Sequence, residues 1–434
     1  MIVVSSISSL KLSRYLKFLD DIIFIGNAII KTNRNSFCAF FIQLQPMETI
    51  SVVGYSDVGS QTGQDLTELS IGLKHRNLLN HIYCRGVEKR VVPNDFITTP
   101  IPLGRTIPRA MTGINQFLME DFNNRYYSER IFDFFASKSI SNSGIHLHHT
   151  PGYIRTLREG NKNGNKTVVK ATTEYTDSFY QRVLNESEKI EISSPKFPTE
   201  NKRSKFRKKT LQECDQILAI STFVKNSLLS SGIQPSKISV TPLGVKPERY
   251  PTGSEKNHDH FTVLYVGSVT VAKGIPHLLK AWRLNEWGDD NHIRLLLCGR
   301  VSSTMRKILS QYDFDNVQTP GFVDPREYYQ NASVFVFPSI SDGFGKAPLE
   351  AMAAEVPVIT TDHTGMPDIM KDGKEGFIVP AADAQALADR LRHLRENPEV
   401  CRSMRDHALK TAQEQTWDQH AEAVAEALDL VEIN

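Results

Sequence analysis

Apolar and polar positions alternate along this chain in two periods. Residues 50–53, Ile-Ser-Val-Val, form a short strand-like run rich in β-branched residues that opens into a glycine-rich loop. Leu66, Leu69 and Leu73 then recur at helical spacing, and a second predicted strand follows at residues 81–84. A strand, a helix and another strand in this order predict the opening βαβ unit of a parallel sheet that is covered on both faces.

The same order returns in the second half of the chain. Residues 262–266 form an apolar run, the turn Lys273-Gly274 follows, and a helical pattern then places four apolar residues at positions i, i+3, i+4 and i+7: Ile275, Leu278, Leu279 and Trp282. We therefore expect an α/β chain with two doubly wound parallel sheets. The stretch 246–260, rich in proline, glycine and charge, is the predicted linker.

Both ends of the chain have distinct patterns. Asp383 has the position of a helix cap before an apolar stripe, and a last amphipathic helix is predicted from near Trp417 to Val431. Near the start, the apolar stretch 22–30 is less than half of the ~20 residues that a membrane-spanning helix needs. We expect residues 1–46 to be an extension outside the core or the result of a mistaken start codon, with the core beginning at Met47; a weak interfacial helix is the alternative.

Composition narrows the class of protein. A chain of 434 residues fits two domains, and 40% hydrophobic with 23% charged residues indicates a globular chain. The formal net charge of +2 argues against a globally basic, nucleic-acid-binding protein. The five cysteines are widely spaced and show no zinc-type pattern, so we expect a cytoplasmic protein.

The segment 336–350 carries the strongest chemical signal. A buried strand is predicted to end in a polar turn with Gly343 and Gly345, and a helix follows with Pro348 at its first position. Free amides at a helix start bind anions, and glycines let a ligand approach the backbone. Glu350, one turn into the helix, can accept hydrogen bonds from vicinal hydroxyls such as those of a ribose.

This segment resembles a known signature. Asp342, seven intervening residues and Glu350, with Gly-Phe-Gly after the first acid, are similar to the Glu-x7-Glu motif of the retaining nucleotide-sugar glycosyltransferases of family 4, the glycosyl transferases group 1. Further blocks in the expected order extend the resemblance over about residues 50 to 430: 213–222, 242–245, 266–274, 350–359 and 364–368.

The resemblance implies the GT-B fold, in which two Rossmann-like domains face one cleft. It divides the chain into an acceptor-side domain, a linker, a nucleotide-sugar-binding domain and a helix that crosses back to the first domain: 47–245, 246–260, 261–410 and 411–434. It also implies transfer of a hexosyl group, with retention, from a nucleotide-diphosphate sugar to a carbohydrate, lipid-linked or small-molecule acceptor. No metal and no cofactor other than the donor are expected.

The same resemblance assigns roles to individual residues. Lys273 is placed at the diphosphate, where it would stabilise the charge of the leaving group, and Asp342 against the transferred sugar. Glu350 is placed at the ribose. The remaining donor contacts are expected from Ser268, Phe322, Val323, Gly343, Phe344, Gly345, Thr364 and Gly365.

Three positions depart from the family pattern. Asp342 is one methylene shorter than the usual Glu, and Ser268 stands where an Arg often helps to hold the diphosphate. Glu355 stands at a helix end where Gly is usual, at an expected cost of about 1 kcal/mol in a left-handed conformation. A family position that often holds a histidine falls within residues 171–175, which contain none.

A strand that ends in three imidazoles leaves alternatives open. Residues 144–152 include His146, His148 and His149; alternation along a strand separates neighbouring side chains, and no carboxylate follows at ligand spacing, so a metal site is not favoured. His149 either lines the cleft, where it acts as a catalytic residue by bonding the sugar or acceptor, or all three histidines are structural.

Two other features invite functional hypotheses. Asp313-Phe-Asp315 has the form of a metal-binding pair but is predicted to lie in a surface loop. The basic run from Lys202 to Lys209 is either a solvated face or a surface that docks on an anionic membrane or a phosphorylated acceptor, with the protein then peripheral on the inner face of the membrane.

Two rival functions remain beside the glycosyltransferase. Both sheets are Rossmann-like, which is compatible with an NAD-dependent oxidoreductase, but neither opening turn has Gly-x-Gly-x-x-Gly. Ser268 and Asp342 are compatible with a catalytically weak, sugar-nucleotide-binding partner subunit.

Overall fold

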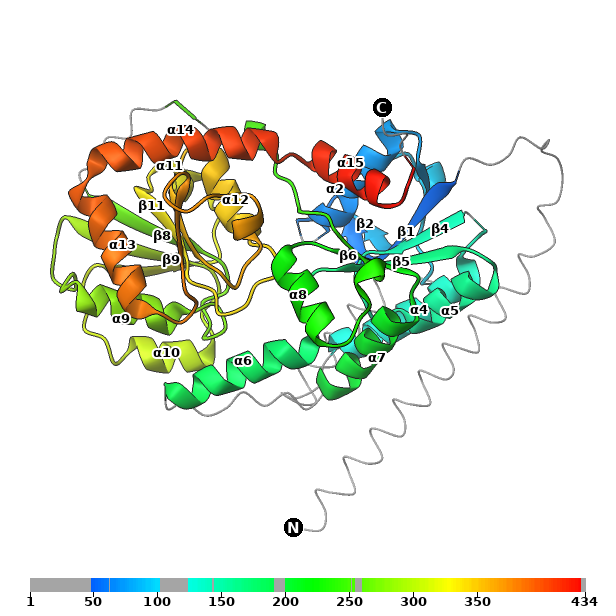
Figure 1. Ribbon diagram of the computed structural model, residues 1–434, viewed down its shortest axis with the longest axis horizontal. Helices are drawn as coiled ribbons and strands as arrows, with labels where there is room; N and C mark the ends of the chain where they lie inside the picture. The colour runs from blue at the N-terminus through cyan, green and yellow to red at the C-terminus, as the bar shows by residue number, and fades with distance from the viewer. Residues whose placement is uncertain are drawn as a thin grey trace, which may run out of the picture.

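The structure is a computed structural model with two lobes, each built on one sheet (Figure 1). It describes residues 48–61, 63–101, 124–142, 144–190, 200–250, 252–253 and 260–430. The predicted segment 1–46 lies outside the described residues.

The N-terminal lobe contains a seven-stranded parallel sheet in the order β3-β2-β1-β4-β5-β6-β7. Its strands are β1 (Thr49–Val58), β2 (Leu79–Val87), β3 (Ile97–Thr98), β4 (Gly144–His148), β5 (Lys166–Ala171), β6 (Gln216–Ala219) and β7 (Ile238–Val240). The helices of this lobe are α2 (Gln64–His75), α4 (Asn124–Ser139), α5 (Ile154–Lys162), α6 (Thr176–Lys189), α7 (Glu200–Glu213) and α8 (Thr222–Ser230).

The C-terminal lobe contains a six-stranded parallel sheet in the order β10-β9-β8-β11-β12-β13. Its strands are β8 (Phe261–Val266), β9 (Ile293–Cys298), β10 (Val317–Gly321), β11 (Val334–Phe337), β12 (Val358–Thr361) and β13 (Gly376–Val379). Its helices are α9 (Ile275–Leu284), α10 (Ser303–Leu309), α11 (Arg326–Gln330), α12 (Lys346–Ala353), α13 (Ala384–Glu396) and α14 (Pro398–Glu414). Two parallel sheets with helices confirm the predicted fold class.

The predicted helical stripes form the cores of the two lobes. The leucines of α2 and the four apolar residues of α9 are all fully buried: Leu66, Leu69, Leu73, Ile275, Leu278, Leu279 and Trp282. Asp383 caps α13, since its Oδ1 accepts a hydrogen bond from the amide of Ala386 at 2.9 Å. Burial of one face of each helix against a sheet is the main source of stability in such a fold.

Two local predictions at α12 have different outcomes. Pro348 is not the first residue of this helix but the third, because Gly345, at φ +95°, lets the chain enter the helix at Lys346. Proline is still tolerated there, since the first-turn amides have no partner within the helix. Glu355 follows α12 at φ +56°, which confirms the left-handed conformation expected of it.

The last helix, α15 (Trp417–Ala427), returns to the N-terminal lobe (Figure 1). It packs on α2, and four of its residues or close neighbours enter the apolar core beneath β1 and β2: Ala421, Val424, Ala425 and Leu428. The expected crossing helix is therefore present, although residues 411–414 belong to α14 and the helix ends before Val431. Beside the crossing, the amide of Val245 donates to the carbonyl of Gln415 at 2.9 Å.

The lobes also touch through Gly343. A Cβ at this residue would lie 2.2 Å from the carbonyl oxygen of Thr172 in the other lobe. Ser221, also in the N-terminal lobe, donates its hydroxyl to the carbonyl of Gly343 at 2.6 Å. Only glycine therefore lets the two backbones approach this closely.

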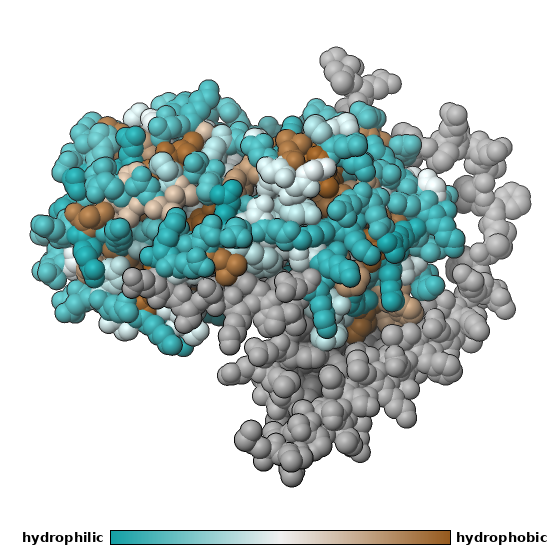
Figure 2. Space-filling view, turned by 60° about the horizontal axis from the view of Figure 1, so that its bottom comes forward, coloured by the Kyte–Doolittle hydropathy of each residue, from teal (hydrophilic) through white to brown (hydrophobic). Residues whose placement is uncertain are grey.

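The surface and the described cysteines are unexceptional for a globular chain. Hydrophilic residues cover most of the described face in Figure 2, with apolar residues in small groups. No helix among the described residues is long and apolar enough to span a membrane. The cysteines within the described ranges, Cys84, Cys214, Cys298 and Cys401, are buried and form no disulfide.

Candidate active site

Two cavities lie between the lobes, and both are lined by residues that follow the carboxyl ends of strands. The smaller, of about 270 Å³, has Gly267 after β8 and Phe337 at the end of β11 in its wall. The larger, of about 730 Å³, has Gly59 after β1 and Phe322 after β10. The carboxyl edge is where open parallel sheets bind ligands, as expected for this chain.

Lys273 projects into the smaller cavity from the turn that precedes α9. Gly274 fixes this turn: it has φ +70°, and a Cβ there would lie 1.7 Å from the carbonyl oxygen of Pro338. Lys273 forms an ion pair with Asp342, and its Nζ lies 5.5 Å from the centre of the Phe337 ring. A cation is thereby held at a defined place in the cavity wall.

Asp342 is oriented by a second contact. Its other carboxylate oxygen, Oδ1, accepts a hydrogen bond from the amide of Phe344 at 3.1 Å. Phe344 and Gly345 line the same cavity, and Gly345 is the cap of α12. The start of a helix with free amides therefore faces the cavity that contains Lys273, and such a combination binds anions.

An ion pair between the lobes crosses the smaller cavity. Lys346, the first residue of α12, donates to Oδ1 of Asp65 in α2 at 2.8 Å. Burial alone would raise the pKa of Asp65, but the charges of Lys346 and Lys170 hold the pKa of that carboxyl well below its usual range. Burial would lower the pKa of Lys346, and the Asp65 carboxylate raises it instead.

Behind Asp65, a buried lysine is held by the crossing helix. Lys170 of β5 is fully buried, and its Nζ lies 3.1 Å from Nε2 of His420 in α15. Since Nδ1 of His420 must donate to the carbonyl of Pro242, at 2.7 Å, Nε2 is the acceptor and Lys170 the donor. Burial lowers the pKa of Lys170 to about 8, although Asp65 opposes the shift.

His149 lies next to this charged group. It is buried, and burial lowers its pKa to about 3, so the imidazole is neutral. It lines neither cavity, and its Nε2 has no hydrogen-bond partner among the described residues. Its predicted contact with sugar or acceptor stays a prediction.

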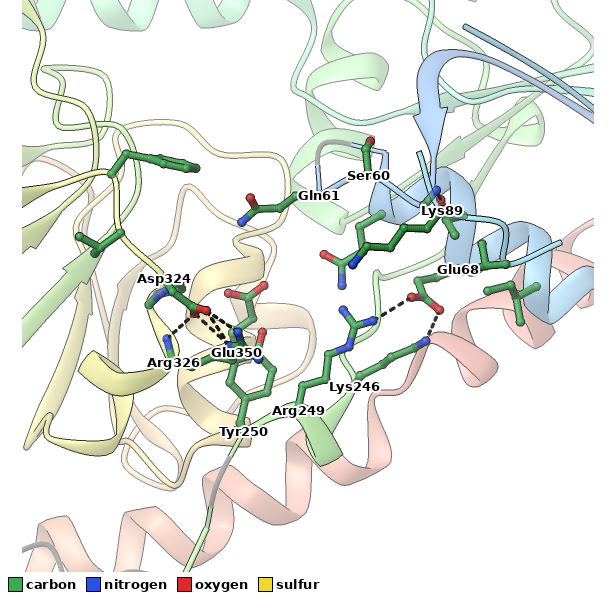
Figure 3. Close-up of a pocket in the computed structure, with 18 residues that line it drawn as sticks. Ser60, Gln61, Glu68, Lys89, Lys246, Arg249, Tyr250, Asp324, Arg326 and Glu350 are labelled. Carbon is green, nitrogen blue, oxygen red and sulfur yellow. Dashed lines mark hydrogen bonds and ion pairs between the residues drawn. The ribbon is translucent and has the colours of Figure 1, made fainter. Parts of the chain in front are cut away.

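The larger cavity contains Glu350 on its C-terminal-lobe side (Figure 3). Tyr329 donates its hydroxyl to Oε2 of Glu350 at 3.2 Å, and Tyr250 provides a second hydrogen bond. Burial raises the pKa of Glu350 despite the opposing charge of Lys346. Nearby Phe322 is 79% exposed, an unusual state for a phenylalanine that lines a cavity.

The opposite wall of this cavity comes from the N-terminal lobe (Figure 3). Ser60, Gln61 and Lys89 face Glu350 and Arg326 across the opening. Glu68 of α2 is ion-paired with Lys246 at 2.7 Å. The cavity thus offers an apolar ring, a half-buried carboxylate and several polar groups, which suits a polar ligand with one aromatic part.

The residues predicted for the site divide into three groups. Lys273, Asp342, Phe344 and Gly345 line the smaller cavity, and Phe322, Val323 and Glu350 line the larger. The others line neither: Ser268, Gly343, Thr364, Gly365 and His149.

Close packing accounts for the positions of the two glycines, and a hydrogen bond accounts for that of Thr364. Gly343 faces Thr172 of the other lobe, and a Cβ on Gly365 would lie 2.8 Å from atoms of Phe344 and Ser221. Thr364 is buried, and its hydroxyl donates to the carbonyl of Thr361 at 2.9 Å. Their roles at the donor stay predictions.

The charged cluster behind and across the smaller cavity has no signal in the sequence pattern. Asp65, Lys170, Lys346 and His420 come from α2, β5, α12 and α15, and only the fold brings them together. Of these four residues, Lys346 is the one that the sequence could have indicated, because it lies inside the motif between Asp342 and Glu350.

The candidate metal ligands remain apart. Within the described ranges, no group of three or more His, Cys, Asp and Glu side chains could hold a metal ion. Asp313 and Asp315 are exposed in the loop before β10. His146 bonds the carbonyl of Ser141 at 2.9 Å, and His148 stacks on Tyr153. Metal independence itself is untested and stays a prediction.

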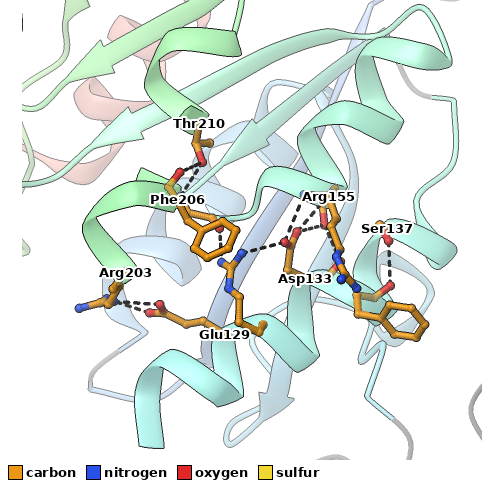
Figure 4. A network of polar contacts seen from close by, with 11 residues as sticks. Glu129, Asp133, Ser137, Arg155, Arg203, Phe206 and Thr210 are labelled. Carbon is orange, nitrogen blue, oxygen red and sulfur yellow. Dashed lines mark hydrogen bonds and ion pairs between the residues drawn. The ribbon is translucent and has the colours of Figure 1, made fainter. Parts of the chain in front are cut away.

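The basic run from Lys202 to Lys209 lies in α7, and Figure 4 shows that part of it contacts the protein itself. Arg203 pairs with Glu129 at 2.8 Å, and Lys208 pairs with Asp177. Phe206 of the same run packs beneath the guanidinium of Arg130, whose Cζ lies 4.3 Å from the ring centre. Docking of this run on an anionic surface stays a prediction.

Comparisons with known proteins agree with the fold. Residues 248–411 match the profile of the family Glycosyl transferases group 1. The chain is 34% identical over 197 residues to the capsular polysaccharide biosynthesis glycosyltransferase CapM of Staphylococcus aureus, covering 41% of this chain and 51% of CapM. It is 28% identical over 184 residues to the amylovoran biosynthesis glycosyltransferase AmsK of Erwinia amylovora, covering 40% and 45%. The chain thus spans about half the length of these curated relatives.

Solved structures share the whole two-lobed arrangement. Sucrose-phosphate synthase from Thermosynechococcus elongatus superposes with a TM-score of 0.65 at 17% identity, covering 88% of this chain and 98% of that one. Anabaena HepE in complex with UDP-glucose superposes with a TM-score of 0.61 at 14% identity, covering 88% and 100%. At these identities the likeness establishes the GT-B fold.

Proposed function

We propose that this chain, whose C-terminal lobe carries a glycosyl transferases group 1 domain, is a glycosyltransferase that uses a nucleotide-diphosphate sugar. The observation that carries the proposal is Lys273, held by Gly274 and Asp342 in a cavity that also receives the start of α12. A fixed cation and free helix amides suit a diphosphate, on which negative charge grows as the glycosidic bond to it breaks.

The two cavities together fit the parts of such a donor. The nucleoside would occupy the larger one, with its base near Phe322 and its ribose hydroxyls at Glu350, and the diphosphate and sugar the smaller one. Lys273 has three N–H donors, so it can keep Asp342 and still bind phosphate oxygen. We infer a metal-independent reaction because these groups supply positive charge without an ion.

The chemical step proposed is transfer with retention at the anomeric carbon. The bond from that carbon to the phosphate oxygen breaks, a bond to the acceptor oxygen forms on the same face, and the departing oxygen takes the acceptor proton. No dedicated base is then required. The relatives CapM and AmsK are named for polysaccharide biosynthesis, which favours a carbohydrate or lipid-linked carbohydrate acceptor here.

Donor binding and one substitution test the proposal. Thermal shift with uridine, guanosine and adenosine diphosphate sugars identifies the donor; UDP-glucose, which HepE binds, is the first to examine. Lys273→Ala should then lose most of the turnover and keep its melting temperature, since the cation acts mainly on the transition state. More than half of the wild-type turnover in this variant would contradict the assignment.

A further inference from the structure

The smaller cavity has two cations, each neutralised by a carboxylate. Lys273 is paired with Asp342, within the C-terminal lobe, and Lys346 with Asp65, across the lobes. Ser268, which follows Gly267 of the cavity wall, provides no positive charge. Among the described residues that line this cavity, a diphosphate would meet Lys273 and the helix amides if Lys346 were absent.

Lys346 is placed to serve the same ligand as Lys273. It is the first residue of α12, directly after Gly345, so its side chain leaves the helix at the end where the free amides face the cavity. Its side chain is 39% exposed, whereas that of Asp65 is 17% exposed. The lysine can therefore turn toward a ligand in the cavity while the aspartate stays in the wall.

Asp65 does not depend on Lys346 alone. The positive charge of Lys170, which lies behind Asp65, also lowers the pKa of the Asp65 carboxyl. His420 fixes Lys170 through a 3.1 Å contact between Nε2 and Nζ. When Lys346 moves to another anion, Asp65 thus keeps a cation nearby and stays ionised.

We propose that Lys346 is the second cation of the diphosphate site, and that Asp65 holds it in the free protein until the diphosphate takes its place. This inference rests on the proposed nucleotide-sugar donor. It predicts effects of opposite sign for the two partners. Removing the lysine removes a phosphate contact, whereas removing the aspartate removes a competitor of the phosphate. A bridge that merely held the lobes together would instead give the same sign for both, because either substitution breaks it.

The test is isothermal titration calorimetry of UDP, GDP and ADP. The diphosphate that binds wild type most tightly is then used for all variants, and the corresponding monophosphate is the second probe. Lys346→Met should weaken diphosphate binding by about tenfold or more, as for a lost charge-assisted contact, with a smaller effect on the monophosphate. Asp65→Asn should tighten diphosphate binding several-fold. The double variant should bind like Lys346→Met, since Asp65 acts through the lysine.

Two control variants change charge elsewhere. Lys280→Met removes an exposed lysine of α9, and Asp418→Asn removes the carboxylate that pairs with Arg76 at the other end of α2. Both should bind like wild type. Melting temperatures establish that each variant is folded.

The outcomes separate the two proposals. If wild type binds no nucleoside diphosphate, the proposed function fails and this inference with it. If wild type binds normally but Lys346→Met is unchanged, or Asp65→Asn weakens binding as the lysine variant does, the inference alone is overturned.

Discussion

Lys170 allows a quantitative test of the charged cluster, because a fully buried ammonium must couple folding to pH. Burial lowers the pKa of Lys170 to about 8 from an ordinary value of 10.5. Between these values the unfolded chain binds a proton that the folded chain does not, so stability rises with pH in this window. A tenfold change in an equilibrium constant is worth about 1.4 kcal/mol, which makes the expected gain about 3 kcal/mol.

Lys170→Met removes this coupling. At pH 7 this substitution has two opposed effects on stability. Removal of the buried charge stabilises the fold, whereas loss of the hydrogen-bond donor to His420 destabilises it. The pH dependence has no such ambiguity. The free energy of unfolding of wild type should rise by about 3 kcal/mol relative to Lys170→Met between pH 8 and 10.5, and the two should run parallel below pH 7.

Urea denaturation at closely spaced pH values from 6 to 10.5 measures the difference. Lys166→Met is the matched control, since Lys166 is on the same strand, four residues away, but only half-buried. Its curve should follow wild type at every pH. Parallel curves for wild type and Lys170→Met would refute the reasoning, because they would mean that Lys170 titrates alike in both states.

Three other outcomes are expected. Glu350→Gln should raise the KM for donor more than it lowers kcat, since it weakens the proposed ribose contact; an unchanged KM at normal rate would place Glu350 outside the site. EDTA should leave turnover unchanged, and full loss that magnesium or manganese restores would bring Asp313 and Asp315 back as ligands. Gly343→Ala should lower stability by about 1–3 kcal/mol in thermal unfolding, because its Cβ would meet the Thr172 carbonyl at 2.2 Å; a melting temperature equal to wild type would contradict this close contact.

Local patterns were sufficient for the fold. The apolar stripes of α2 and α9 each follow a strand and precede another, and such βαβ order leaves few topologies. The cap at Asp383 and the left-handed residue Glu355 were also predicted, because both depend on a few neighbouring residues. The predicted start of α12 was wrong by two residues, because the helix begins directly after Gly345, at Lys346, and not at Pro348.

The site was predictable only where its members share one short segment. Asp342, Gly345 and Glu350 belong to one motif, and the structure places them along the cavity walls. The partners of Lys346 and Lys170 are Asp65 and His420, which lie 281 and 250 residues away in the sequence. No periodicity or spacing rule links such positions, so their pairing required the packed lobes.

The double crossing between the lobes has a mechanical consequence. One connection leaves the N-terminal lobe after Val245, the other enters it before Trp417, and the two are joined by the hydrogen bond from the Val245 amide to the Gln415 carbonyl. Two segments joined side by side resist twisting more than a single segment does. They bend most easily about an axis that lies in their common plane and crosses both. We expect this pair to act as a hinge that lets the cleft open and close in one direction. α15 follows this pair in the chain and carries His420. The contact between His420 and Lys170 should therefore stay intact when the N-terminal lobe moves.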